Sequence, residues 1–211
     1  MSDFKGFTQE DFNIFHIDGL EDRMEALRST LSPKLESIAT DLAPTVSAMT
    51  GDEMFVHVAK HARRTTNPPN DTWASLASSK RGYKKLPHFQ IGLWESHVFI
   101  WFAVIYESPI KDSYARVLKS QIDDIRSSLP EGFVWSKDHT KPDVISNDTL
   151  SDESMMALLD RLETVKKAEL LCGVTIDRND PVLQDGEAFL TYAENVLKEL
   201  NTLYERTKEI Q

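Results

Sequence analysis

Residues 98–106 constrain the fold more than any other part of this 211-residue chain. The nine residues read VFIWFAVIY, which are mostly β-branched and aromatic and present no polar face. A membrane-spanning helix needs about 20 apolar residues, so this segment is too short to cross a bilayer. β-Branched and aromatic residues favour strands, and a strand without a polar face is buried on both sides. The segment therefore predicts a strand at or near the centre of a sheet.

Neighbouring segments predict further strands. Apolar and other residues alternate in residues 88–94 and again in residues 170–176, with the two-residue period of a strand. Residues 54–61 and 133–135 also indicate strands, whereas residues 71–77 fit either a short capped helix or a strand. These short strands, close together in the chain, predict an antiparallel sheet.

Helical patterns dominate both ends of the chain. Leu20, Met24, Leu27 and Leu31 form an apolar stripe at the helical period. Ser32 and Pro33 predict a new helix start, and Pro44 is expected to kink or divide the helix that follows. Three more helices are predicted: from Ser108 and Pro109 to Leu129, after Ser151, and from Asp185 to about Arg206. We therefore predict a single α+β domain over residues 1–211, in which helices from both termini pack on an antiparallel sheet.

Cysteine content and the N-terminus indicate a cytoplasmic protein. The single cysteine, Cys172, has no partner for an internal disulfide, and its place in an apolar alternation predicts a buried, inert thiol. The first residues lack the basic and apolar regions of a signal peptide. We expect no association with a membrane.

Positive charge is concentrated in one part of an acidic chain. The formal net charge is -10, yet residues 54–90 contain seven Lys or Arg residues and a single acid, Asp71. Guanidinium and ammonium groups match the oxygens of phosphates and carboxylates, so this concentration points to an anionic ligand. The alternatives are a solvated basic face and internal pairing with the acidic excess.

We predict a ligand site from the expected topology. The predicted strands 54–61 and 88–94 lie in one sheet, and their ends lead into the basic segments 60–64 and 80–85, which can meet at one rim. Arg63, Arg64, Arg81, Lys84 and Lys85 are expected to share that surface. The predicted ligand-binding residues are Lys60, His61, Arg63, Arg64, Trp73, Arg81, Tyr83, Lys84, Lys85 and His88.

Three other functions remain open. An interaction protein can use the same basic face to dock an acidic partner or a second copy of the chain. Nucleic-acid binding is less favoured, because the rest of the chain is strongly acidic and no RNA-recognition, KH or helix-turn-helix signature is present. An enzyme is the third alternative, although the chain has no phosphate-binding glycine loop, no nucleophile elbow and no complete catalytic constellation.

The histidines suggest no metal site. His57 and His61 lie in a predicted strand, where four residues span about 13 Å, too far for one shared ion. Asp138 and His139 raise a different alternative, an acid/base pair with a group across a cleft. They are poor partners for each other, because neighbours on an extended chain point to opposite sides, and their polar segment is typical of a loop. We therefore predict neither a metal nor a cofactor.

Several segments resemble one known family. These are DFNIF (11–15), GLEDRM (19–24), HVAKHARR (57–64), NPPNDTW (67–73), KRGYKKLPHFQIGLW (80–94) and YESP (106–109). The sequence is similar in these segments to the YktB-like proteins of low-GC Gram-positive bacteria, and the resemblance extends over essentially the whole chain. It implies a compact α+β fold and a cytoplasmic bacterial protein. The family is functionally uncharacterised, so the resemblance supplies no catalytic residues.

Overall fold

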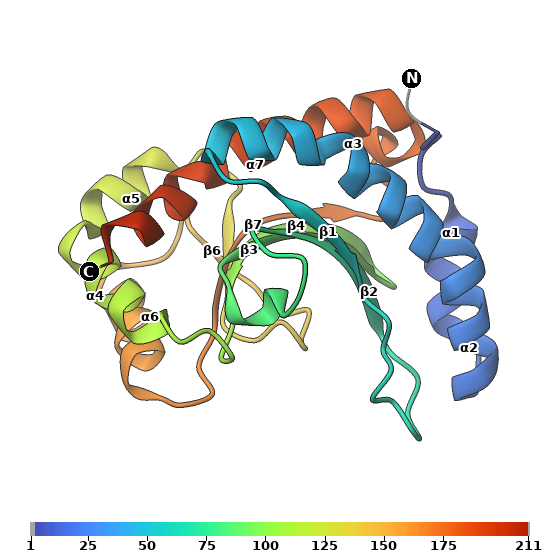
Figure 1. Cartoon of the computed structure of the whole chain (residues 1–211), viewed down its shortest axis with the longest axis horizontal. Helices are drawn as coiled ribbons and strands as arrows, with labels where there is room; N and C mark the ends of the chain where they lie inside the picture. Colours follow the sequence, from blue (N-terminus) through green and yellow to red (C-terminus); the bar gives the residue numbers. More distant parts are fainter. Residues whose placement is uncertain (1–2, 211) are drawn as a thin grey trace.

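The protein is built around one antiparallel sheet of seven strands. The computed structural model describes residues 3–210, and the strand order in the sheet is β1-β2-β3-β4-β7-β5-β6 (Figure 1). The strands are β1 (Phe55–Val58), β2 (Asp71–Ala77), β3 (His88–Trp94), β4 (His97–Val104), β5 (Val134–Ser136), β6 (Ile145–Ser146) and β7 (Leu170–Asp177). This arrangement confirms the predicted α+β class and shows that residues 71–77 form a strand.

Strand β4 lies in the middle of the sheet, as its apolar sequence predicts. It pairs with β3 on one side and with β7 on the other. The strand ends at Val104, two residues before the predicted end, because the chain turns there through a hydrogen bond from Ser108 N to Ile105 O. Tyr106 is accordingly exposed, so it does not belong to the buried strand.

Helices pack mainly against one face of the sheet. The helix α3 (Ser32–Thr50) and the C-terminal helix α7 (Gly186–Arg206) cross that face, so both ends of the chain contribute to its cover (Figure 1). No helix within residues 3–210 has the length and apolar character needed to cross a membrane. The remaining helices are α1 (Gln9–Asn13), α2 (Leu20–Ala26), α4 (Lys111–Ser120), α5 (Ile122–Ser128) and α6 (Asp152–Thr164).

Two predicted helix starts are confirmed by their caps. The Ser151 side chain accepts a hydrogen bond from Ser154 N at the start of α6, which satisfies a backbone donor that the helix itself leaves free. Asp185 does the same for Glu187 N and Ala188 N at the start of α7. These local hydrogen bonds explain why the first turn of each helix could be located from sequence alone.

Prolines have less effect on the helices than predicted. The helix α3 begins at Ser32 with Pro33 in its first turn, as predicted. Ser32 is not a cap, however, because the helical path continues from α2 into α3 through a wide π-type turn at Leu27–Leu31. Pro44 lies inside α3 without dividing it, because packing of α3 against β2 and α7 holds the helix together. The helix predicted after Ser108 begins later, at Lys111, and is interrupted at Gln121 between α4 and α5.

The two faces of the sheet bury different sets of side chains. Alternate residues of the central strands join the main core beneath the helices, whereas the others form a smaller apolar cluster on the opposite face, which we call the second face. The second-face cluster contains Trp73, Phe99, Trp101, Ala103, Ile105 and Leu171, with Ala59, Trp94 and Val134 packed against it.

Two glycines make room for the aromatic rings on the second face. A Cβ atom at Gly92 would lie 2.4 Å from the Phe99 ring, and one at Gly173 would lie 2.9 Å from the Trp101 ring. Any larger residue would displace these rings from the sheet, so both glycines are needed for an aromatic floor.

Cys172 is buried in the main core and forms no disulfide. Burial raises the pKa of its thiol well above the usual value, because a thiolate is poorly solvated there. The thiol is therefore unreactive, as predicted.

Candidate functional site

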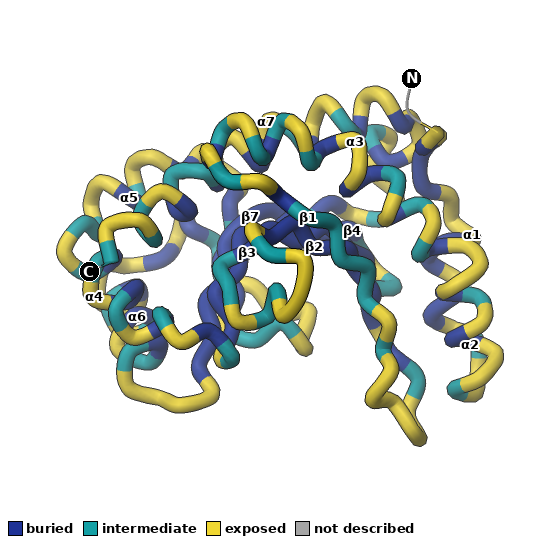
Figure 2. The backbone as a smooth tube through the Cα atoms, viewed as in Figure 1, coloured by how far each residue is buried: buried dark blue, intermediate teal, exposed yellow. Residues whose placement is uncertain are grey.

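A cavity of about 1250 Å³ opens where β1, β2 and the exposed connection of residues 59–70 meet the second face. Figure 2 shows this connection extending from the sheet as an exposed loop. The lining combines cationic, aromatic and acidic side chains that come from distant parts of the chain. It consists of Arg28, Ser32, Glu36, residues 56–64, Asn70, Asp71, Trp73, Tyr83, Lys84, Trp94, His139 and Thr140.

Seven of the ten predicted site residues line this cavity. They are Lys60, His61, Arg63, Arg64, Trp73, Tyr83 and Lys84. Arg81 and Lys85 are exposed outside the lining, and His88 is buried beneath it. The five cations expected on one surface are thus divided between the cavity and the outside.

The topology explains this division. Strand β2 lies between β1 and β3, so the basic segments leave its opposite ends rather than meeting at one rim. The short 3₁₀ turn at Tyr83–Lys85 folds back over the second face and brings Tyr83 and Lys84 to the cavity. Lys80 instead lies over the Phe55 ring, 5.3 Å from its centre.

Aromatic contacts hold this turn in place. Trp73 Nε1 donates a hydrogen bond of 3.1 Å to the Tyr83 hydroxyl. The Tyr83 ring stacks on His57, with 4.9 Å between ring centres. Lys84 Nζ lies 5.7 Å from the centre of the Trp73 ring, at the distance of a cation–π contact. One positive charge is thereby held over the aromatic floor of the cavity.

His88 supports the site from below. Gln90 Nε2 donates to His88 Nε2 at 2.8 Å, and His88 Nδ1 donates to Leu86 O at 2.7 Å, so both ring nitrogens are occupied. Burial lowers the pKa of His88 to about 4. His88 is therefore a neutral structural residue at physiological pH, and Tyr83 packs on its edge at 5.1 Å between ring centres.

The pKa of His61 is affected by positive charges inside the cavity. Its backbone is left-handed, with φ of 47°, and its Nε2 lies 3.2 Å from Thr72 Oγ1. Burial, together with the nearby charges of Arg64 and Lys84, lowers its pKa to about 4. The electrostatic field at His61 therefore opposes a further positive charge and favours an anion.

The seven basic residues of the 54–90 segment have no acidic partners. Within residues 3–210, none of them comes within 4.0 Å of a carboxylate oxygen, whereas ten other Lys and Arg residues form such ion pairs. Direct ion pairs with the acidic excess therefore do not neutralise this charge, and Asp71 acts on Arg64 and Lys84 at longer range.

Asp71 interacts electrostatically with two of these cations, Arg64 and Lys84. It is buried at the start of β2, and burial raises its pKa to about 6. Arg64 and Lys84 act in the opposite direction, because their positive charges stabilise the carboxylate, and His139 does the same only when its ring is protonated. Asp71 therefore changes its charge close to neutral pH within a cationic cavity.

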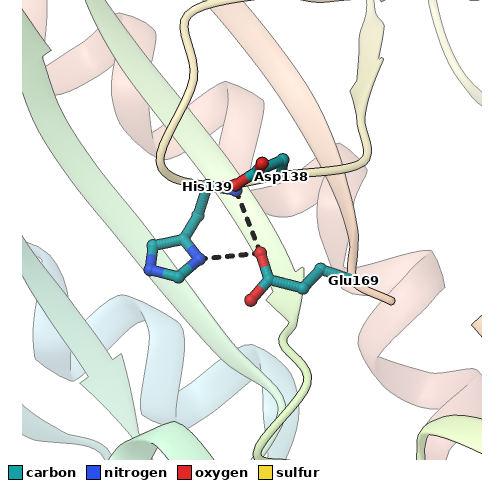
Figure 3. A group of neighbouring side chains, drawn as sticks. All are labelled: Asp138, His139 and Glu169. Carbon is teal, nitrogen blue, oxygen red and sulfur yellow. Dashed lines mark hydrogen bonds and ion pairs between the residues drawn. The ribbon is translucent and has the colours of Figure 1, made fainter. Parts of the chain in front are cut away.

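Sequence reasoning did not identify Glu169 as the partner of His139. His139 lies in the β5–β6 loop, and Glu169 directly precedes β7. The His139 Nδ1 atom lies 2.7 Å from Glu169 Oε2 (Figure 3). The pairing of β5 with β7 brings these residues together across 30 positions of the chain, and no local pattern in the sequence indicates it.

The same pair belongs to a group that has suitable atoms for a metal ion. One ligand atom from each of Asp138, His139 and Glu169 lies within 4.8 Å of the others. These atoms already satisfy one another or the local backbone: Asp138 Oδ1 accepts from Thr140 N at 3.0 Å and Glu169 Oε2 accepts from His139 N at 3.0 Å. The geometry is that of a hydrogen-bonded pair and a turn, so we assign no metal to it.

Comparisons with known proteins identify a family and name no activity. A family model described as a domain of unknown function (DUF1054) matches residues 7–204. The chain belongs to this family. A UPF0637 protein of Bacillus velezensis is 52% identical over 204 residues, which cover 97% of both chains. Another, from Bacillus mycoides, is 47% identical over 198 residues, covering 94% of this chain and 95% of the relative. The resemblance to the uncharacterised YktB-like family is thus confirmed.

Proposed function

We propose that this protein is a cytoplasmic bacterial binding module for a small anionic ligand, phosphorylated or carboxylated. The observation that carries the proposal is a cavity lined by five Lys or Arg side chains and two carboxylates, in which none of the five cations forms a direct ion pair within the described residues. Cations that lie close together without direct ion pairs repel one another, and a bound anion offsets this repulsion.

The cavity also suits a ligand with a planar part. Trp73, Trp94 and Tyr83 provide aromatic surface beside Lys84. Ligand pockets of about 300–1,000 Å³ usually hold drug-sized molecules, so a volume of about 1250 Å³ is sufficient for a nucleotide or a sugar phosphate. Ring stacking and ion pairing at one site favour such a compound over a simple inorganic ion.

The test is a double charge reversal, Arg64→Glu with Lys84→Glu, assayed against nucleotides, sugar phosphates, organic acids and inorganic pyrophosphate. A ligand that binds only the native state stabilises it by about 2.7 kcal/mol at a hundred times its dissociation constant. We expect at least one of these anions to raise the melting temperature of the wild type. The double variant should lose more than about a hundredfold in affinity, because it removes two charged hydrogen bonds of about 1.5–3 kcal/mol each. Calorimetric titration measures that loss.

The matched control is Lys166→Glu with Lys167→Glu, which makes the same change in net charge outside the cavity. This control should bind as the wild type does. Unchanged affinity in a folded Arg64→Glu, Lys84→Glu protein would contradict the proposal. Self-association that weakens as salt rises, without any bound small anion, would instead favour docking of an acidic protein surface.

A further inference from the structure

Glu169 holds His139 in one orientation. The Glu169 side chain is 4% exposed, and its Oε2 accepts hydrogen bonds from His139 N at 3.0 Å and from His139 Nδ1 at 2.7 Å (Figure 3). Its other oxygen lies 3.5 Å from Tyr106 N. A buried carboxylate with these partners fixes both the ring and its tautomer, because only a protonated Nδ1 can donate to it.

The opposite nitrogen of His139 is left available. With the proton on Nδ1, the Nε2 atom carries a lone pair, and the described residues provide no hydrogen-bond partner for it. The ring stands edge-on to Trp73, 6.1 Å between centres, and His139 and Thr140 line the cavity. A proton acceptor, on His139, therefore lines the same cavity as the cations that form no direct ion pair.

The other histidines differ from His139. His57 Nε2 donates to Ser79 O at 2.8 Å, and His88 has both nitrogens occupied. His16 pairs with Glu95 at the surface, where both side chains are largely exposed. Across residues 3–210, only His139 is bound to a buried carboxylate.

We propose that the cavity hydrolyses a carboxylic ester whose acid or alcohol part is anionic, with His139 as the general base and Glu169 as its positioning residue. This inference rests on the proposed anion binding, because the cations must hold the substrate beside His139. An imidazole aligned by a carboxylate and facing a bound substrate is the arrangement used for proton abstraction in acyl transfer.

The reaction needs only water as a second reactant. His139 Nε2 takes a proton from water while the water oxygen forms a bond to the acyl carbon, which gives a tetrahedral intermediate. The ester C–O bond then breaks, and its electron pair stays on the leaving oxygen. The imidazolium, stabilised by Glu169, returns its proton to that oxygen, so that an acid and an alcohol are released and His139 is again neutral.

The experiment compares an anionic ester with its neutral counterpart. The probes are 4-acetoxybenzoate and methyl 4-acetoxybenzoate, which differ by one charge at the far end of the ring. We expect the wild type to hydrolyse the anion with the higher kcat/KM. His139→Gln should lower kcat by about a hundredfold or more, the usual contribution of a general base. The matched control His16→Gln, outside the cavity, should leave the rate unchanged.

Glu169→Gln tests the positioning role. It should lower kcat with little effect on KM and move the acidic limb of the pH–rate profile, because an amide does not stabilise the imidazolium. Free imidazole should restore turnover to His139→Ala, an effect that a merely structural role would not produce. If Glu169→Gln does not fold, His139→Gln and the imidazole rescue decide the question.

Pyrophosphate titration of the same proteins separates the two proposals. If wild type and His139→Gln bind pyrophosphate alike but the wild type does not hydrolyse 4-acetoxybenzoate, or both hydrolyse it equally, the catalytic inference is overturned and anion binding stands. If the wild type binds neither pyrophosphate nor 4-acetoxybenzoate and hydrolyses no ester, both proposals fail. A His139-dependent preference for the anionic ester supports both.

Discussion

Replacing Gly173 by alanine is expected to destabilise the protein by about 3 kcal/mol or more, or to prevent folding. Gly173 lies in β7, opposite Trp101 of β4. A Cβ atom there would lie 1.8 Å from the backbone oxygen of Ile100 and 2.9 Å from the Trp101 ring. Because the oxygen belongs to the neighbouring strand, the clash can be relieved only by separating β4 from β7 at the centre of the sheet.

Urea denaturation of Gly173→Ala and Thr175→Ala measures this effect. Thr175 lies on the same strand two residues later, so its side chain points to the same face. Its replacement should cost about 1 kcal/mol or less, since only a small strand preference is lost. A Gly173→Ala protein as stable as Thr175→Ala would show that the two strands can adjust around the methyl group.

Much of the sheet could be predicted because its signals are local. The apolar sequence of β4 and the alternation in β3 follow directly from burial on one or both faces. The caps Ser151 and Asp185 lie within three residues of the donors that they satisfy. Such features depend on neighbours in the chain and not on the tertiary arrangement.

The polar face of β3 shows where this reasoning stops. Alternation predicts that His88 and Gln90 face away from the main core, and they do, but both are buried rather than exposed. The reason is the turn that carries Tyr83, which folds back onto this face and packs against His57 and His88. The direction of a turn of this kind depends on the tertiary structure, which a periodic pattern does not contain.

The site was harder to predict than the sheet for the same reason. Charge density identified Arg64 and Lys84 as candidates, but the order of β1, β2 and β3 decides which cations meet. His139 and Glu169 become neighbours only because Ser136 of β5 pairs with Leu171 of β7. Non-local strand pairing therefore creates the part of the site that composition and spacing could not indicate.

Asp71 gives the second large effect, a change of stability with pH. In the folded protein burial raises its pKa from 3.8 to about 6. A carboxyl with a raised folded pKa stabilises the fold fully below the unfolded value, and this contribution is lost as pH rises through about 6. Two pKa units correspond to about 3 kcal/mol. The free energy of unfolding of Asp71→Asn, relative to that of the wild type, should therefore be about 3 kcal/mol higher at pH 8 than at pH 3.

Urea denaturation between pH 3 and pH 8 tests this expectation, with the exposed Asp143→Asn as the control. The control should follow the wild type at every pH. If the difference between Asp71→Asn and the wild type does not change across pH 4–7, then Asp71 is ionised in the fold at no cost, and its burial is offset by Arg64, Lys84 and His139.

The same substitution should strengthen anion binding. Ionised Asp71 cancels part of the positive field of Arg64 and Lys84, so its removal is expected to tighten pyrophosphate binding about tenfold at pH 8, or roughly 1.4 kcal/mol. At pH 5 the wild-type carboxyl is largely protonated, so the two proteins should bind alike. Calorimetric titration at both pH values measures this difference directly, because it follows binding to the folded protein and not the stability of the fold. If Asp71→Asn instead weakens binding, the carboxyl contacts the ligand directly, because only a lost hydrogen bond could outweigh the removal of a negative charge.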